Sequence, residues 1–439
     1  MTASARVAQA GAMSMETLLA EPRSIEDTGL TLGFLVDMVA KMLYYEGSLS
    51  GFRIAEALCL PFHQVIERVL EFMKREQLCQ IRGSGSLVTG SFEYVITDQG
   101  RVKAREVLER NQYAGPAPVP LTQYARGAAL QRTRDRVITP AMVREGLAHL
   151  VTSPALQDRI GAAVNSGQAI FLYGLPGNGK TVIAEAIGRN MMPGDVYVPY
   201  AVEVDGQVIK LFDPLVHEEA QEPPPEKGGN GSAPRRDMRW VRCKRPVVVT
   251  GGELVMESLD LNYNTTTKYY EAPLQMKANG GVFLLDDFGR QLVRPRDLLN
   301  RWIVPLEKQV DFLTLHTGKK IQVPFETLIV FSTNLDPKSL VDEAFLRRIR
   351  HKINIPSPTP DEFREIFRRV CASRNISYDE EILAYLLDRY YVRANRELRS
   401  CHPRDIIYQA MDAARYLGQA SRLTKELIDF ACTSYFVDL

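Results

Sequence analysis

The sequence predicts a three-part chain: a small α+β domain at the N-terminus, an α/β core with a parallel sheet, and an all-helical C-terminal domain. Short apolar runs that suit buried parallel strands alternate with helical segments: QAIFLY (168–173), PVVVTG (246–251), GVFLLD (281–286) and TLIVFST (327–333). A proline-rich stretch, residues 113–121, separates this region from an earlier, mostly helical unit. From Thr359 onwards the apolar pattern is helical throughout.

Composition and charge exclude several classes of protein. With 45% hydrophobic and 24% charged residues, the 439-residue chain is unlike a collagen-like, mucin-like or wholly disordered protein. Its 54 basic and 53 acidic residues nearly cancel, so any attraction to nucleic acid or membrane must come from a local patch. No apolar run approaches the ~20 residues of a membrane span, and the N-terminus has no signal-peptide core. We therefore expect a cytoplasmic protein without a membrane span.

The N-terminal region has its own pattern of elements. Residues 1–24 are small and polar, and we expect them to be disordered. Residues 25–112 then show a helix from about Thr31, a helix capped by Ser50, a third helix after Pro61, two short strands around a Gly/Ser tip, and a final helix. This order of elements resembles a winged helix-turn-helix domain.

The resemblance raises the question of DNA binding. In the winged-helix family the third helix enters the major groove, so residues 60–95 are a candidate DNA-binding surface. The outward residues of that helix are His63, Gln64, Glu67, Arg68, Glu71, Lys74 and Arg75. Glu67 and Glu71 would repel phosphate, and the predicted wing offers only Arg82. Docking on a protein or on another copy of the chain is therefore favoured over DNA binding.

Composition marks the remaining boundaries. Residues 113–134 are predicted to be a proline-rich, semi-rigid linker. The α/β core covers residues 135–356, and the low-complexity stretch 217–237 within it is expected to be a flexible surface insert. Residues 357–439 form the predicted helical domain.

The strongest functional signal is a glycine-rich loop between a predicted strand and a predicted helix. It matches G-x-x-x-x-G-K-[ST], and its candidate nucleotide-binding residues are Gly174, Pro176, Gly177, Asn178, Gly179, Lys180 and Thr181. Glycines let backbone N–H groups approach phosphate oxygens, and the positive N-terminus of the following helix points at them. Lys180 is placed for the β- and γ-phosphates and Thr181 for Mg²⁺. We expect ATP and Mg²⁺ as ligands.

A second motif places two acids, Asp286 and Asp287, at the end of the strand GVFLLD. Ligands bind at the carboxyl ends of strands in open α/β sheets. Asp286 is placed to hold Mg²⁺ through water, and Asp287 is placed to polarise an attacking water. Helix capping is the other common use of acids at such a position.

These motifs and their spacing resemble the AAA+ ATPases over residues 135–435. The resemblance implies that Asn334, in VFSTNLDP, is the sensor 1 residue that orients the attacking water. It also implies that Arg347 or Arg348 is an arginine finger reaching the neighbouring subunit's nucleotide, and that Arg404, in HPRDII, is sensor 2 in a helical lid. Read singly, the first two arginines would also fit a solvated helix face, and Arg404 a helix cap. The family implies ATP hydrolysis between subunits of a homo-oligomeric ring, which we expect to be a hexamer.

One position departs from the family pattern. Most members carry Asp-Glu where this chain has Asp286-Asp287. The shorter carboxylate falls short by ~1.5 Å, about one C–C bond. Misplacement on that scale can cost ~10² in rate. We therefore expect either slow hydrolysis or a shifted water.

Two further segments bear on the type of motor. FLTL and KIQVPF flank a Thr-Gly-Lys turn and predict a β-hairpin just before the strand TLIVFST. It resembles the pre-sensor-1 hairpin of one AAA+ branch, whereas the Arg347-Arg348 pair resembles the protein-remodelling members, so the subclade stays open. Residues 253–270 are a candidate pore loop or a plain connection, and at least one of Tyr269 and Tyr270 is expected in the core.

Three functions follow from these patterns. The first, which we favour, is a chaperone-like ring motor that remodels a protein client. The second is a DNA-associated ATPase that uses the winged helix. The third is an ATP-gated assembly switch with slow hydrolysis, which the Asp286-Asp287 pair favours.

Overall fold

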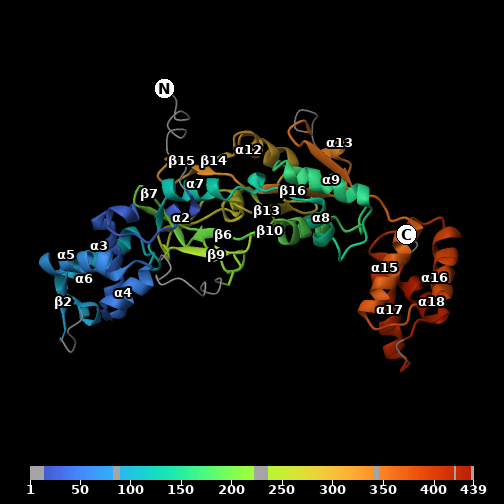
Figure 1. Ribbon diagram of the computed structural model, residues 1–439, viewed down its shortest axis with the longest axis horizontal. Coiled ribbons are helices and arrows are strands. Elements are labelled where there is room, and N and C mark those ends of the chain that lie inside the picture. The colour runs from blue at the N-terminus through green and yellow to red at the C-terminus, as the bar shows by residue number, and fades with distance from the viewer. Residues whose placement is uncertain (1–13, 83–88, 222–235, 341–345, 420–421, 437–439) are drawn as a thin grey trace, which may run out of the picture.

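The computed structural model describes residues 14–82, 89–221, 236–340, 346–419 and 422–436 (Figure 1). The N-terminal domain and the C-terminal helices lie at opposite ends of the long axis, and the strands of the core lie between them (Figure 1). No helix within these described ranges is long and apolar enough to cross a membrane.

The N-terminal domain contains its elements in the predicted order, with one additional strand, β1. Its bounds are η1 Glu26–Thr28, α3 Leu32–Glu46, β1 Ser48–Ser50, α4 Gly51–Leu58, η2 Phe62–Ile66, α5 Glu67–Arg75, β2 Cys79–Ile81, η3 Thr89–Ser91, β3 Glu93–Ile96 and α6 Asp98–Arg110. The strands form an antiparallel sheet in the order β1-β3-β2. The side chains of Thr31, Ser50 and Thr97 cap α3, α4 and α6. The Gly/Ser tip at 83–88 lies outside the described residues.

Residues 14–24, expected to be part of a disordered segment, are ordered. Helix α2, Met15–Leu18, is capped by Ser14. Leu18 and Leu19 are buried, and Leu18 lies beside Gly127 and Trp240. The expectation was wrong for this stretch because two leucines bury apolar area against a later part of the chain.

The predicted linker also folds. Residues 119–120 form strand β4 (Val119–Pro120), which pairs in parallel with β7 (Ala201–Val204), and Leu121–Leu130 form helix α7. Val119 and Tyr124 are buried. The proline-rich composition was misleading because its apolar residues find partners in a sheet built from distant segments.

The core is a five-stranded parallel sheet in the order β10-β13-β16-β5-β17. Its strands are β5 Ile170–Tyr173, β10 Val247–Thr250, β13 Val282–Leu285, β16 Leu328–Thr333 and β17 His351–Asn354. The helices around it are α8 Pro140–Gly146, α9 Pro154–Asn165, α10 Lys180–Ala186 with η5 Ile187–Met191, α11 Leu274–Lys277, α12 Pro295–Lys308 and α13 Pro337–Leu340. The four predicted apolar runs form four of the strands, and β13 and β16 are buried along their whole length. This is the doubly covered sheet expected of an α/β core.

A second group of strands, here called the β module, is assembled from several insertions. It comprises β4, β6 Val196–Pro199, β7 Ala201–Val204, β8 Gln207–Lys210, β9 Trp240–Cys243, β11 Asn262–Asn264, β12 Tyr269–Glu271, β14 Val310–Thr314 and β15 Lys320–Pro324. The hairpin β14–β15 precedes β16 as predicted, and buried side chains from both of its strands join the core of the module. The candidate pore segment 253–270 contributes η6 Met256–Leu259, β11 and part of β12, and Tyr270 is buried.

The predicted flexible insert 217–237 is packed at both of its described ends. His217 and Asp237 are 2% and 1% exposed. His217 Nδ1 accepts a hydrogen bond from the Asp213 N–H, and Nε2 donates to the Lys277 carbonyl. The rest of the insert, 222–235, lies outside the described residues.

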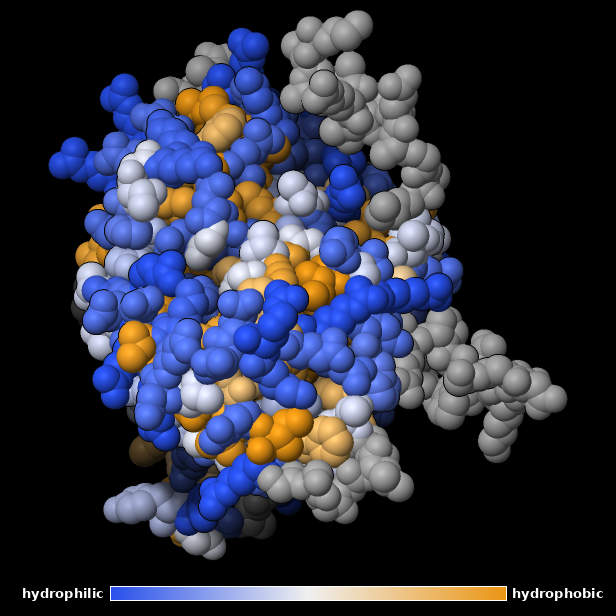
Figure 2. All heavy atoms as spheres, turned by 90° about the vertical axis from the view of Figure 1, so that its left-hand side faces the viewer, coloured by the Kyte–Doolittle hydropathy of each residue, from blue (hydrophilic) through white to orange (hydrophobic). Residues whose placement is uncertain are grey.

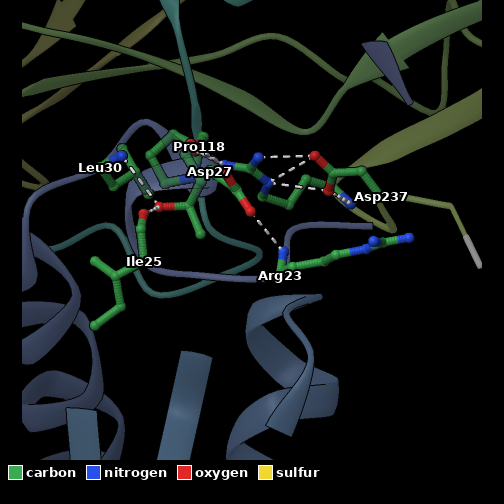
Figure 3. Close-up of polar contacts among 8 residues, drawn as sticks. Arg23, Ile25, Asp27, Leu30, Pro118 and Asp237 are labelled. Atoms are coloured by element: carbon green, nitrogen blue, oxygen red, sulfur yellow. Dashed lines mark hydrogen bonds and ion pairs between the residues drawn. The ribbon is translucent and has the colours of Figure 1, made fainter. Parts of the chain in front are cut away.

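Arg239 joins the N-terminal domain to the β module, and two of its partners, Pro118 and Asp237, are labelled in Figure 3. Its guanidinium makes a two-pronged, fully buried ion pair with Asp237 and donates to the carbonyls of Thr28 and Pro118, at 2.9 and 3.1 Å. Thr28 lies where the chain enters the domain, and Pro118 lies just after it leaves. Ala201 and Val208 of the module also belong to the hydrophobic core of the domain. Domain and module therefore share one packed interface.

The described part of residues 357–439 is a bundle of helices. Its elements are α15 Pro360–Ser373, α16 Glu380–Leu387 with η7 Asp388–Val392, α17 His402–Tyr416 and α18 Lys425–Tyr435. Thr359 and Glu362 form a capping box that starts α15. The bundle has its own apolar core, in which Phe363 and Phe367 are fully buried.

Candidate functional site

The glycine-rich loop leaves β5 at Tyr173 and enters α10 at Lys180. Gly177 and Gly179 have φ angles of +81° and +82°, which favour glycine because it has no Cβ. A Cβ at Gly177 would lie 2.5 Å from Cys401 Sγ, so a larger residue here would displace that side chain of the helical domain. At these two positions the loop therefore presents backbone rather than a side chain.

Lys180 is held beneath this loop. Its ammonium donates to the carbonyls of Gly174 and Leu175 at 3.0 and 2.9 Å and to Asn334 Oδ1 at 2.5 Å. Burial lowers the pKa of Lys180, while the charges of Asp286 and Asp287 oppose that shift and Arg399 adds to it. The cation already sits among acceptors that an anionic ligand would replace.

The acidic pair meets the loop at the ends of β13 and β16. Thr181 Oγ1 donates to Asp286 Oδ2 at 2.8 Å. Asn334 Nδ2 donates to Asp287 Oδ1 at 3.0 Å, so Asn334 connects Asp287 to Lys180. Asp287 has a φ of +47°, an uncommon conformation for a residue with a side chain. The structure thus brings five of the predicted residues together as a cluster of two hydrogen-bonded groups, Thr181–Asp286 and Lys180–Asn334–Asp287.

A cavity of about 370 Å³ opens over this cluster. Pro176 lines it together with the loop residues, and Arg404, in the first turn of α17, lines it from the helical domain. Arg404 Nε donates to Asp405 Oδ1 at 2.9 Å. Asn178 binds across to the helical domain, accepting from the Ser400 N–H and donating to Ser357 Oγ. Loop, sheet edge and helical domain together enclose the cavity.

Arg347 and Arg348 lie elsewhere. Neither is among the described residues that line this cavity. Arg348 Nε donates to Glu307 Oε1 on α12 at 2.7 Å, and Arg347 is exposed. The structure does not bring these arginines to the loop of their own chain.

A second cavity, of about 280 Å³, shares Leu150, Gly179 and Ser400 with the first and was not predicted from the sequence. One wall is the irregular segment His149–Thr152 between α8 and α9, and the other is the face of α15 that carries Ile366 and Val370. The residues of these walls belong to no recognisable sequence motif. The only signal in the sequence is the helical spacing of apolar residues in α15. The apolar lining suits a flat, uncharged group next to the polar cavity.

The parallel sheet, the glycine-rich loop and the acidic strand end fit the α/β core of a P-loop nucleoside triphosphatase, with a helical domain placed against the loop. A family described as a domain of unknown function (DUF8689) matches residues 359–434, which is the helical domain. No curated protein matches the chain.

Solved structures give distant likenesses. NtrX from Brucella abortus in complex with ADP has 13% identity and a TM-score of 0.39 over 75% of this chain and 59% of that chain. NtrX from the same organism in complex with ATP has 14% identity and a TM-score of 0.39 over 75% of this chain and 62% of that chain. The RuvB Holliday junction branch migration motor from Thermotoga maritima has 13% identity and a TM-score of 0.38 over 68% of this chain and 74% of that chain. This chain thus spans about three-fifths of NtrX.

Proposed function

We propose that this chain is an AAA+ ATPase that binds and hydrolyses ATP between the subunits of a ring and uses the energy to remodel a protein client. The observation that carries the proposal is the cluster of Lys180, Thr181, Asp286, Asp287 and Asn334 beneath one cavity. A triphosphate is a dense anion, and this cavity offers backbone N–H groups, a lysine and an arginine to it. The apolar cavity beside it takes the adenine base.

The oxygen ligands of the cluster suit Mg²⁺. The hydroxyl of Thr181 and the carboxylate of Asp286 lie within hydrogen-bond distance, and Mg²⁺ prefers such hard oxygen donors together with phosphate oxygens. When bound, the ion neutralises charge on the β- and γ-phosphates. Thr181 and Asp286 are the residues that would hold it.

Asp287 and Asn334 carry the hydrolytic step in this proposal. Asp287 accepts a hydrogen bond from the attacking water, and Asn334 holds the carboxylate in place. Lys180 leaves the Asn334 amide for the phosphates when ATP binds, which frees the amide oxygen for the water. Because Asp287 is shorter than the family's glutamate, turnover is expected to be slow, and this keeps the assembly-switch function as the second candidate.

A ring explains the position of the two remaining arginines. Arg347 and Arg348 do not line their own cavity, whereas Arg404 does. We assign Arg404 to the nucleotide of its own subunit and Arg347 or Arg348 to that of the next subunit, most simply in a hexamer. An arginine supplied in trans contributes ~10³–10⁵ in rate in other phosphoryl-transfer enzymes.

The N-terminal domain is proposed to be a winged helix that docks on protein. Of the two acids on α5, Glu67 accepts hydrogen bonds from Thr89 Oγ1 at 2.7 Å and from His63 at 3.4 Å. Glu67 therefore lies on the face of α5 that contacts η3, the turn before β3. Figure 2 shows this end of the molecule as mainly hydrophilic, with apolar residues scattered in small groups. DNA binding through residues 60–95 is the less favoured alternative, and salt-sensitive retention on DNA would support it.

The proposal is tested by measuring ATP hydrolysis against protein concentration while light scattering reports the oligomer. A specific rate that rises with ATP-driven ring formation supports a site completed in trans. Lys180→Ala is expected to abolish ATP binding, and Arg347→Ala or Arg348→Ala to spare binding but remove hydrolysis. A fully active monomer would contradict the ring and both finger assignments.

A further inference from the structure

Arg369 spans the cavity that we assign to the adenine base. It lies on α15 of the helical domain, and its Nη1 donates to the carbonyls of Ala148 and Leu150 in the core, at 2.8 and 3.2 Å. On its own helix, Nε donates to Glu365 Oε1 at 2.7 Å. The carboxylate thus orients the guanidinium while the guanidinium holds two carbonyls of the opposite wall.

These carbonyls belong to an irregular segment whose N–H groups are used in local turns, Ala148 N–H donating to Glu145 O and Leu150 N–H to Leu147 O, while Arg369 binds the carbonyls of the same two residues. Residues 147–152 lie between the end of α8 and the cap of α9 at Ser153, and they are outside any helix or strand. The same segment supplies Leu150 and Val151 to the apolar cavity. A donor that holds residues 148 and 150 therefore fixes the wall on which a base would lie.

The helical domain also touches the core on the phosphate side. There the N–H groups of Cys401 and Ser400 donate to Gly177 O and Asn178 Oδ1, at 2.9 and 3.2 Å. Arg369 makes its contact on the other side of the apolar cavity. Of these contacts from the helical domain, Cys401 lines only the phosphate cavity, Ser400 lines both cavities, and Arg369 lines only the apolar cavity.

From this geometry we infer that Arg369 is a positioning residue for the nucleotide base, which closes the helical domain onto the segment 148–150. The inference rests on the proposed ATP binding and adds to it which contact makes affinity depend on the base. Arg369 itself lines the apolar cavity and is not among the residues that line the phosphate cavity, so its loss is expected to weaken binding of ATP and ADP and to leave binding of a bare polyphosphate unchanged. Arg369→Lys keeps the positive charge but lacks the planar set of donors of the guanidinium, so it should retain part of the affinity.

The neighbouring residue Arg368 provides a matched control. It lies on the same helix and pairs with the same carboxylate, Glu365, at 2.8 Å, and none of the hydrogen bonds described for it reaches the core. Both arginine side chains are about half exposed, at 57% for Arg368 and 44% for Arg369, so both variants are expected to fold. Comparing variants of Arg368 and Arg369 therefore distinguishes the effect of the contact with the core from the effect of losing a positive charge on α15.

The test compares Arg369→Ala, Arg369→Lys and Arg368→Ala with the full-length protein. Dissociation constants for ATP, ADP and inorganic tripolyphosphate are measured by competition with a fluorescent nucleotide, after thermal melting has shown that each variant is folded. We expect Arg369→Ala to weaken ATP and ADP about tenfold, as for the loss of charge-assisted hydrogen bonds. Tripolyphosphate binding and the Arg368→Ala variant should match the wild type.

Two results overturn the inference while leaving ATP binding intact. One is an unchanged affinity of Arg369→Ala for ATP, and the other is an equal loss with tripolyphosphate or with Arg368→Ala. If the wild type binds neither ATP nor tripolyphosphate, the proposed function fails first and this inference fails with it. The failures are therefore distinguishable.

Discussion

At Asp287 the chain has a carboxylate one methylene shorter than the glutamate that the AAA+ resemblance leads one to expect. The residue has a positive φ and is held by Asn334, so its position is fixed by the backbone turn and by one amide. A small change in side-chain length there translates directly into a displaced oxygen.

Asp287→Asn is expected to lower the hydrolysis rate by at least ~10² with little change in ATP affinity, because an amide cannot accept the proton of the water. Asp287→Glu is expected to raise the rate, by up to ~10², because it moves the carboxylate about one bond length outward. Steady-state hydrolysis and nucleotide binding on the same preparations check both. Wild-type turnover in Asp287→Asn would remove Asp287 from the mechanism.

His402 gives the helical domain a dependence on pH. Burial, helped by the charge of Arg399, lowers the pKa of His402 to about 4, and its Nδ1 lies 2.9 Å from the Tyr391 hydroxyl. In the unfolded chain the pKa is about 6.5, so between these values the unfolded chain binds more protons than the folded one. The contribution of neutral His402 to the free energy of unfolding is therefore fully present above pH 6.5 and is lost as the pH falls from 6.5 towards 4.

The expected loss is at most about 3 kcal/mol between pH 6.5 and 4. Denaturant unfolding, monitored by hydrogen exchange of the amides in α17, measures this loss of unfolding free energy. His402→Gln has no group that titrates in this range, so its stability should fall less steeply than that of the wild type. Equal slopes for the two proteins would show that His402 is not the titrating group.

Single residues were predictable where the chemistry is local in the sequence. The glycine-rich loop, Asp286 and Asp287 each belong to a short motif next to a buried strand. The contact of Asn334 with Lys180 joins residues 154 positions apart, so it depends on the pairing of β16 with β5. The base cavity was missed because Leu150 and Ile366 carry no motif and meet only when the helical domain lies against the core.

At the scale of elements, the strands of the core were predictable from continuous apolar runs. Strand β17 was not, because its sequence, HKIN, is largely polar and only Ile353 is buried. The linker over 113–134 was predicted from its prolines, but β4 and α7 find partners in β7, α2 and β15. Local composition does not show such partners, because the β module is built from insertions far apart in the sequence.

Tyr124 tests whether α7 is part of the fold. Its ring is buried, and its hydroxyl accepts from Asn279 Nδ2 at 2.7 Å. Tyr124→Ala is expected to cost ~3–5 kcal/mol of unfolding free energy, as for other large aromatic deletions, and Tyr124→Phe considerably less. The exposed Leu130 on the same helix is the control, because Leu130→Ala should cost little. A negligible effect of Tyr124→Ala would restore the view of a free linker.

At the scale of the whole molecule, Arg239 decides how the N-terminal domain is attached. Arg239→Met leaves Asp237 buried without its partner and frees the carbonyls of Thr28 and Pro118, which is expected to cost ~3–5 kcal/mol locally. We expect the segment 111–121 to become sensitive to protease while ATP binding is retained.

Arg301→Met is the matched control for that prediction. Arg301 makes a comparable pair with buried Asp311, at 2.5 and 3.0 Å, within the β module and core, and none of its described contacts reaches the N-terminal domain. It should leave 111–121 protected. Equal protection in both variants, or rapid cleavage of the wild type, would show that Arg239 does not hold the domain.

The position of Arg239 has a mechanical consequence. A domain tied by one flexible strand transmits only tension, whereas a domain fixed where the chain enters and where it leaves also transmits torque. Arg239 fixes the N-terminal domain to the β module at both of these points, and the hairpin β14–β15 of the module is joined to β16 by the three residues 325–327. Asn334 directly follows Thr333, the last residue of β16, so the strand that leads away from the β module ends at the amide that contacts Lys180 and Asp287.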